Sequence, residues 1–206
     1  GTVTWTFRLR SAKWSDGQAV TANDFVYAWR RLANPASGSP YASILSVVAG
    51  YDQVLETGDT SLLQVSAPND STLEVVLNGN YDWFLTEVCT SPATLPLRED
   101  VVTTLRDAAV ERNRAAEEET GQEGTERWWS DPAALVTNGA YVPGTYTPDE
   151  SFTLTANDRY YGSITGPGQL NFYFADTAEE AAALYDDKTV DLVWPLTDEE
   201  IERQAE

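Results

Sequence analysis

Carboxylates next to tryptophans are the side chains of this sequence that could perform acid–base chemistry. Asp82 precedes Trp83, and Asp131 lies two positions after Trp129. Two carboxylates beside aromatic rings is the arrangement that glycoside hydrolases use, with one acid and one nucleophile or base. The chain carries 33 acidic residues and 7 tryptophans, so such neighbours arise by chance. We therefore predict no catalytic residue, and keep an acidic carbohydrate-active enzyme as an alternative.

Histidine is absent and cysteine occurs once, which removes most other chemistries. Without histidine there is no Ser-His-Asp triad, no Cys-His dyad and no imidazole ligand for a metal. Cys89 has no second cysteine to pair with and follows an apolar stretch, so we expect a buried structural thiol. The oxygen donors Asp149, Glu150 and Asn157 do not have the spacing of a regular calcium loop. We predict neither a metal nor a cofactor.

The net charge of −20 excludes one class of partner. Only 13 of the 206 residues are Lys or Arg, and nucleic-acid binding requires clustered basic side chains. Hydrophobic residues make up 42% of the chain, which is enough to form a core. No apolar run approaches the roughly 18 residues that a membrane-spanning helix needs. We expect a folded, acidic chain with no nucleic-acid partner.

Periodicity predicts the elements that would position any site. Residues 3–9 alternate as a strand does, Asp16-Gly17 is a turn signal, and Thr21 is a typical N-cap for a helix over 22–33. Two further strands, 62–67 and 72–77, form a predicted hairpin around the polar turn 68–71.

A long helix over 99–119 separates this region from a second set of elements. The second set consists of strands over 140–146, 151–156 and 169–174, a helix over 177–186 and a short apolar strand over 190–194. Strand, helix and strand in this order predict a βαβ-like end.

Five segments, in order along the chain, resemble the extracellular solute-binding proteins of family 5. They are Trp5 to Leu32, Ser39-Pro-Tyr41-Ala-Ser43, Val136-Thr-Asn-Gly139-Ala-Tyr141, Leu154-Thr-Ala-Asn157-Asp-Arg-Tyr160-Tyr161, and Thr177 to Tyr185 running into Val190-Asp191-Leu192. Each segment alone is a weak signal, but five in order across nearly the whole chain are specific.

The resemblance implies a fold with two lobes that close on a ligand, one lobe carrying an extra small domain. We therefore expect a mixed α+β and α/β chain that forms part of a type II periplasmic-binding-protein-like lobe. Residues 1–131 would be the small extra domain, and 132–206 a partial first lobe. Members are much longer, so the chain is expected to be a fragment. The acidic stretch 99–125 would be an insertion relative to the family, with no assigned role.

The resemblance also implies where a ligand would lie. Tyr41 occupies the position at which the oligopeptide-binding members place a tyrosine against bound peptide. Val193 and Trp194 end a strand that, in the resembling fold, approaches the cleft between the lobes, although Trp194-Pro195 stands where those members tend to have Tyr-Asn. The turn from Trp14 to Gly17 is interpreted as structural, with Asp16 bonding backbone amides.

The function implied is the ligand-capturing portion of an extracellular oligopeptide-binding protein that feeds an ABC importer. It would have no enzymatic activity, and its partners would be a peptide and the permease subunits. The location implied is extracellular or periplasmic, with tethering only through an anchor outside these residues, as in a lipoprotein. A carrier of a dipeptide, a nickel chelate or an oligosaccharide on the same fold is the alternative within the family.

Overall fold

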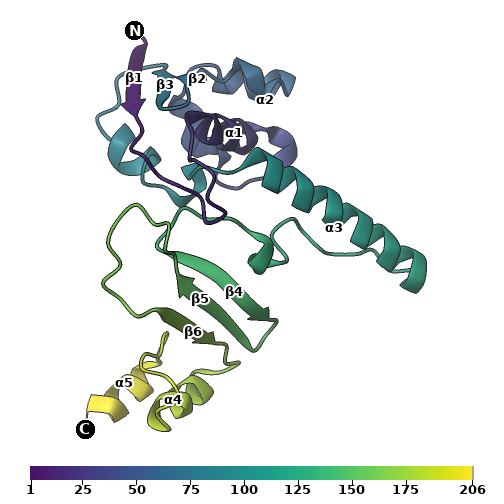
Figure 1. Cartoon of the computed structure of the whole chain (residues 1–206), viewed down its shortest axis with the longest axis vertical. Helices are drawn as coiled ribbons and strands as arrows, with labels where there is room; N and C mark the ends of the chain where they lie inside the picture. The colour runs from purple at the N-terminus through teal and green to yellow at the C-terminus, as the bar shows by residue number, and fades with distance from the viewer. Residues whose placement is uncertain (206) are drawn as a thin grey trace.

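The computed structural model describes residues 1–205, apart from the side chains of residues 200, 204 and 205. Two three-stranded antiparallel sheets organise the chain, one in residues 1–131 (the N-terminal part) and one in residues 132–205 (the C-terminal part). Figure 1 shows these parts one above the other along the long axis, with the chain ends at opposite extremes. The mixture of helices and sheets confirms the predicted fold class.

The first sheet has the strand order β1-β3-β2, with β1 at Val3–Arg8, β2 at Val65–Asn69 and β3 at Thr72–Leu77. The predicted alternation in β1 is confirmed, because Trp5 and Phe7 both turn toward Phe84 in the core. Their ring centroids lie 5.9 Å and 6.4 Å from that of Phe84.

The predicted four-residue turn at 68–71 is wrong in length. Strand β2 continues to Asn69, which pairs with Thr72, so only Asp70 and Ser71 connect the two strands. The register shifts between Ser66 and Asn69. Pro68 falls within this irregularity, where a residue without a backbone N–H interrupts the ladder least.

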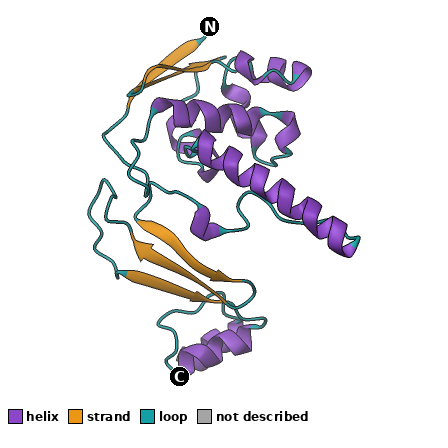
Figure 2. Cartoon of the chain, turned by 45° about the vertical axis from the view of Figure 1, so that its right-hand side comes forward, coloured by secondary structure: helices purple, strands orange, loops and turns teal. Residues whose placement is uncertain are grey.

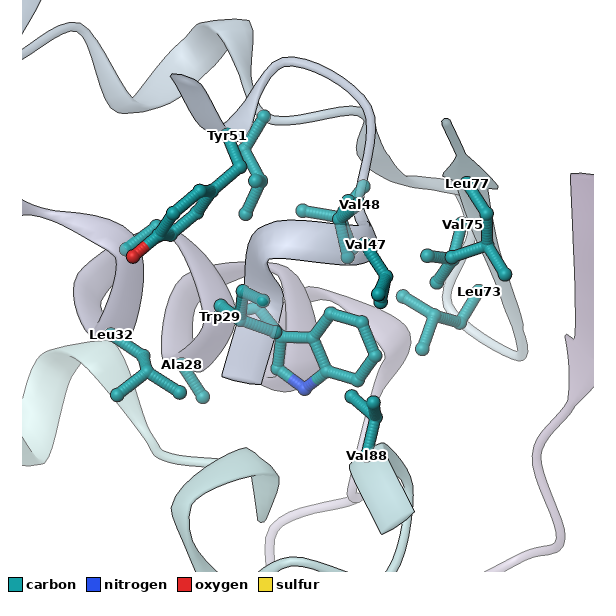
Figure 3. Close-up of a cluster of buried hydrophobic side chains, with 14 of the residues drawn as sticks. Ala28, Trp29, Leu32, Val47, Val48, Tyr51, Leu73, Val75, Leu77 and Val88 are labelled. Atoms are coloured by element: carbon teal, nitrogen blue, oxygen red, sulfur yellow. The ribbon is translucent and has the colours of Figure 1, made fainter. Parts of the chain in front are cut away.

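Helix α1 lies on this sheet because one of its faces is apolar. The helix spans Ala22–Ala33 and buries Trp29, which is only 2% exposed, along with Ala28 and Leu32. Figure 3 shows the Trp29 indole at the centre of the core, between α1 and the strand residues Leu73, Val75 and Leu77. Short elements close the core around it: α2 (Tyr51–Thr57), 3-10 turns at Pro35–Ser37, Ala42–Val47, Thr60–Leu62 and Pro92–Thr94, and a π turn at Phe84–Val88.

The long helix α3 spans Glu99–Thr120, which confirms the helix predicted over 99–119. Figures 1 and 2 show it projecting from the body of the molecule. The returning chain runs along it, since the Asn113 side chain donates to the backbone oxygen of Glu126 at 2.9 Å and accepts from its N–H at 2.8 Å. The stretch predicted to be an insertion therefore forms a projecting helix, which is hydrogen-bonded to the chain segment that follows it and runs back along it.

The second sheet has the order β4-β5-β6, with β4 at Tyr141–Thr147, β5 at Ser151–Ala156 and β6 at Gln169–Tyr173. A 3-10 turn at Pro132–Ala134 precedes it, and helices α4 (Ala178–Asp186) and α5 (Asp198–Ala205) follow it. Figure 2 shows these helices beyond the sheet, on the side away from the N-terminal part.

The strand predicted over 190–194 is wrong, and with it the βαβ reading of this end. Residues 187–197 are irregular. The N–H groups of Thr189 and Val190 donate back to the Leu184 carbonyl at 2.9 Å and 3.3 Å, so the chain folds against the end of α4. In the described chain no strand lies beside this segment, and an apolar run cannot form a ladder without a partner.

Candidate ligand-binding site

Tyr41 lies in the N-terminal part, immediately before the 3-10 turn that starts at Ala42. Its backbone is fixed, because its N–H donates to Ser39 Oγ at 3.3 Å and its carbonyl accepts from the Ile44 N–H at 3.1 Å. The side chain is 66% exposed. A phenol held on a fixed backbone and open to solvent can offer a ligand both a flat apolar face and a hydroxyl.

Val193 and Trp194 lie in the irregular segment between α4 and α5. Trp194 is 88% exposed, and its neighbour Leu192 is also exposed, whereas Val193 is partly buried. An indole this open lies at a surface and is not part of the core described for this chain.

The structure does not bring Tyr41 and Trp194 together. Tyr41 lies between α1 and α2, whereas Trp194 lies between α4 and α5, beyond the β4-β5-β6 sheet (Figure 1). The site residues expected from sequence are therefore separate exposed positions on the two parts.

The turn from Trp14 to Gly17 has the structural character that its sequence predicted. Trp14 is buried, and its Nε1–H donates to Asp24 Oδ2 at 3.1 Å; the same oxygen accepts from the Thr21 N–H at 2.8 Å. Asp16 Oδ1 accepts from the Gln18 N–H at 3.0 Å. Gly17 has φ of 92°, which side-chain-bearing residues rarely adopt.

Residues 15–17, which we term the connecting turn, attach the N-terminal part to the C-terminal part. The Ser15 N–H donates to the Thr137 carbonyl at 2.8 Å, and the Thr137 N–H donates to Ser15 Oγ at 3.2 Å. Arg159 Nη1 donates to the Ser15 carbonyl at 3.2 Å. These three hydrogen bonds join segments more than 120 residues apart.

Arg98 fixes the connecting turn from the other side. Its guanidinium lies 3.0 Å from Asp16 and also pairs with Asp100 at the start of α3. Hydrogen bonding to Asp100, followed by that to Asp16, raises the pKa of Arg98 above its usual value. The same contact lowers the pKa of Asp100 below its usual value. The cation is thus shared between two anions and holds the turn to the base of the projecting helix.

Three of the five segments that carry the family resemblance meet at this connection. The first supplies the turn itself, the third supplies Thr137, and the fourth supplies Arg159 and Tyr161. Tyr161 adds a further contact, because the guanidinium of Arg10 lies 4.8 Å from the centre of its ring. Sequence reasoning identified the segments but missed Arg98, Thr137 and Arg159 as partners of one turn.

Asp131, one of the two carboxylates considered for catalysis, has a structural role. Asp131 Oδ1 accepts from the Ala133 N–H at 3.1 Å and caps a 3-10 turn. Asn157, weighed above as a calcium ligand, is buried and bonds Gly139 and Arg159. Among the side chains that the structure describes, no group of three or more His, Cys, Asp or Glu is placed to hold a metal ion.

Cys89 is half-buried, and it is a free thiol. Burial raises the pKa of this thiol to about 11. The thiolate, which is the nucleophilic form, is therefore scarce at neutral pH. This agrees with a structural thiol, although Cys89 is less buried than its sequence predicted.

The part of the chain that the structure describes contains no helix with the length and apolar character needed to cross a membrane.

Comparison with known proteins covers the whole chain. The sequence model of the bacterial extracellular solute-binding proteins, family 5 middle region, matches residues 1–206. The periplasmic oligopeptide-binding protein OppA of Escherichia coli is 37% identical over 164 residues, which cover 77% of this chain. The probable deoxycholate-binding periplasmic protein YgiS of the same organism is 31% identical over 199 residues, or 91% of this chain.

Solved structures agree with the sequence matches. OppA of Haemophilus influenzae, in complex with the peptide RPPGFSPFR, superposes with a TM-score of 0.79 and 29% identity. The match covers 97% of this chain and 36% of that one. The chain spans 26% of the length of the Escherichia coli OppA and 32% of YgiS.

Proposed function

The chain belongs to the bacterial extracellular solute-binding proteins of family 5, and from this we propose that it is the ligand-capturing portion of an extracellular oligopeptide-binding protein. The observation that carries the proposal is the likeness, over 97% of the chain, to an OppA structure that holds a peptide. The 37% identity to a second oligopeptide-binding protein supports the same ligand class.

We propose that the N-terminal part (1–131) is the extra small domain of the family and that residues 132–206 form part of the first lobe. The connecting turn supports this division, because Ser15 bonds to Thr137 of the C-terminal part, whereas Asp16 pairs with Arg98 inside the N-terminal part. Because Thr137 and Arg159 are bonded to the turn, the two parts would move together as one rigid unit when the cleft closes.

Tyr41, Val193 and Trp194 are proposed as ligand contacts on that wall. The exposed phenol of Tyr41 can stack on a peptide unit and bond it through the hydroxyl. Trp194, almost fully exposed, would form the wall of a side-chain pocket. Bonding to the peptide main chain, with roomy wet pockets for side chains, lets such a site accept varied sequences.

The proposed protein performs no chemistry and carries no cofactor. It captures a peptide by lobe closure and presents it to the permease subunits of an ABC importer. Its proposed location is periplasmic or extracellular, with tethering to the outer face of the cytoplasmic membrane through an anchor outside these residues. The periplasmic location of the Escherichia coli relatives supports the compartment.

Replacing Tyr41 tests the proposed contact in the full-length protein that contains this chain. We expect Tyr41→Ala to weaken binding of RPPGFSPFR by about tenfold, because truncation removes both the aromatic face and the hydroxyl. Tyr41→Phe should retain much of the affinity through the ring. The measurement is isothermal titration calorimetry with each variant.

The matched control is Trp83→Ala, which removes another exposed aromatic ring from the same part of the chain. It should leave peptide affinity unchanged. Equal affinity of Tyr41→Ala and the parent protein would exclude Tyr41 as a ligand contact. Binding of deoxycholate, a dipeptide, a nickel chelate or an oligosaccharide in place of RPPGFSPFR would reassign the ligand within the family.

A further inference from the structure

The β4-β5-β6 sheet has one polar face and one apolar face. The polar face carries alternate residues of β5 and β6 that pair with each other: Ser151, Thr153, Thr155, Gln169, Asn171 and Tyr173. The opposite face, which we term the aromatic face, consists of Tyr146, Phe152, Leu154, Leu170, Phe172 and Phe174. An antiparallel sheet with this alternation packs its apolar face against a core and leaves the other face to solvent.

The rings of the aromatic face pack against one another but are not covered. The ring centroid of Phe152 lies 6.0 Å from that of Tyr146 and 6.3 Å from that of Phe172. The ring centroids of Tyr146 and Phe174 lie 6.4 Å apart. Tyr146, Phe172 and Phe174 are nevertheless all exposed. A contiguous aromatic surface that is open to solvent marks a place where another apolar surface packs.

The C-terminal part has no core of its own beneath this face. Within the described strands β4, β5 and β6 no residue is buried, whereas β3 of the first sheet alone buries three. Among all the described residues from 132 onward, only Asn157 and Ala182 are buried. The cluster of buried apolar side chains that forms the core lies entirely in the N-terminal part. The C-terminal part therefore buries too little apolar surface to be stable by itself.

Two occupants fit the aromatic face: a second copy of the chain, or further residues of the same polypeptide. The net charge of −20 on each chain opposes the association of two copies. The chain superposes over 97% of its length on only 36% of the Haemophilus influenzae OppA, so a family member of that size has many residues outside the matched region. Covalent linkage gives such residues a high effective concentration at the face. These observations favour the same polypeptide.

We propose that the aromatic face is an internal interface, which an apolar segment of the same polypeptide from outside residues 1–206 covers in the full-length protein. The proposal rests on the proposed function only in taking the chain to be part of a longer family member. The six residues of the face include no charged side chain, and burying an unpaired charge against them would be costly. The covering segment therefore presents aliphatic or aromatic side chains, and it completes the core that the C-terminal part lacks.

Hydroxyl-radical footprinting with mass spectrometry tests the proposal without any substitution, because the rate at which a ring is oxidised follows its exposure to solvent. We expect Phe172 to be oxidised in the 206-residue chain and protected in the full-length protein. Tyr173, the next residue, lies on the polar face and is the matched control, which should be oxidised in both. Equal oxidation of Phe172 in the two proteins would overturn the proposal. Protection of Phe172 in the 206-residue chain, together with a dimer in sedimentation velocity, would assign the face to a second copy and would also overturn it.

Phe172→Ala tests whether the covered ring contributes to stability. In the full-length protein we expect the unfolding equilibrium constant to rise by about 100-fold or more, as for other buried phenylalanines. In the 206-residue chain, where the ring is exposed, it should change by no more than about twofold. Urea denaturation of both proteins measures these changes.

Tyr173→Ala is the matched control variant, since it deletes a similar ring from the polar face and should change stability little in either protein. A full-length Phe172→Ala protein as stable as its parent would contradict the proposal. Failure of that variant to fold, with the 206-residue variant unaffected, would agree with it. Neither readout uses a peptide, so this proposal and the proposed peptide binding can fail separately.

Discussion

Trp29→Ala is expected to lower the free energy of unfolding of the 206-residue chain by about 4 kcal/mol, the cost typical of deleting a large buried aromatic side chain. Trp29 is 2% exposed, and its ring packs edge-on against Phe84 with centroids 6.4 Å apart. Its Nε1–H donates to the Thr94 carbonyl at 2.9 Å, so the substitution also leaves a buried acceptor unpaired. Urea denaturation followed by circular dichroism measures the change.

Trp194→Ala is the matched control, since it deletes the same side chain from a position that is 88% exposed. The free energy of unfolding should change by no more than about 0.5 kcal/mol, as expected for a surface substitution away from structural contacts. A loss at Trp194 similar to that at Trp29 would contradict the assignment of Trp194 to the surface.

Asp24→Ala is expected to destabilise the chain by about 3 kcal/mol, because it removes the acceptor of two hydrogen bonds at a mostly buried position. The Trp14 indole N–H and the Thr21 backbone N–H both donate to Asp24 Oδ2. In the variant both N–H groups would lack this hydrogen-bond acceptor, and Trp14 would no longer be fixed beneath the connecting turn. Thermal and urea unfolding of the variant test this.

Asp24→Asn separates the contribution of the hydrogen-bond geometry to stability from that of the negative charge of the carboxylate. Its side-chain oxygen can take the place of Oδ2 and accept from both donors, so the loss should be about half that of Asp24→Ala, since neutral acceptors form weaker bonds than carboxylates. If the alanine variant were as stable as the parent, Asp24 would not be what holds Trp14 and the connecting turn in place.

Local patterns were enough to predict three of the elements. The alternation from Val3, the N-terminus of α1 at Thr21 and the long helix α3 all appear where the sequence placed them. In each, the apolar period distinguishes helix from strand, although the ladder of β1 also requires β3 as its partner.

Features that depend on a distant partner could not be predicted from the sequence. The run 190–194 has the composition of a strand but lies beside no strand in the described chain. The long-range partners of Ser15 and Asp16 come from residues 82 to 144 positions away, and nothing in the sequence near Arg98 marks it for this role. The exposure of individual side chains could not be predicted from the sequence either. The resemblance implied that Tyr41 and Trp194 contact a ligand, and the structure adds that both side chains are exposed to solvent and lie far apart in the fold.

The connecting turn gives the proposed function a physical basis. A binding wall composed of two parts must keep its geometry while the opposite lobe moves. The hydrogen bonds of Ser15 to Thr137 and Arg159 join the two parts at one place, and the ion pair of Asp16 with Arg98 fixes the same turn to the start of α3 within the N-terminal part. Tyr41 is carried by the N-terminal part and Trp194 by the C-terminal part, so this connection would set their separation.

Isothermal titration calorimetry of the full-length protein with RPPGFSPFR and a mixture of short peptides tests the central claim most directly. We predict saturable, one-to-one binding by the full-length protein and no measurable binding by the 206-residue chain alone, because the chain spans only 26% of the length of a related oligopeptide-binding protein and would supply one wall of the cleft. The absence of binding to any peptide by the full-length protein would contradict the proposal.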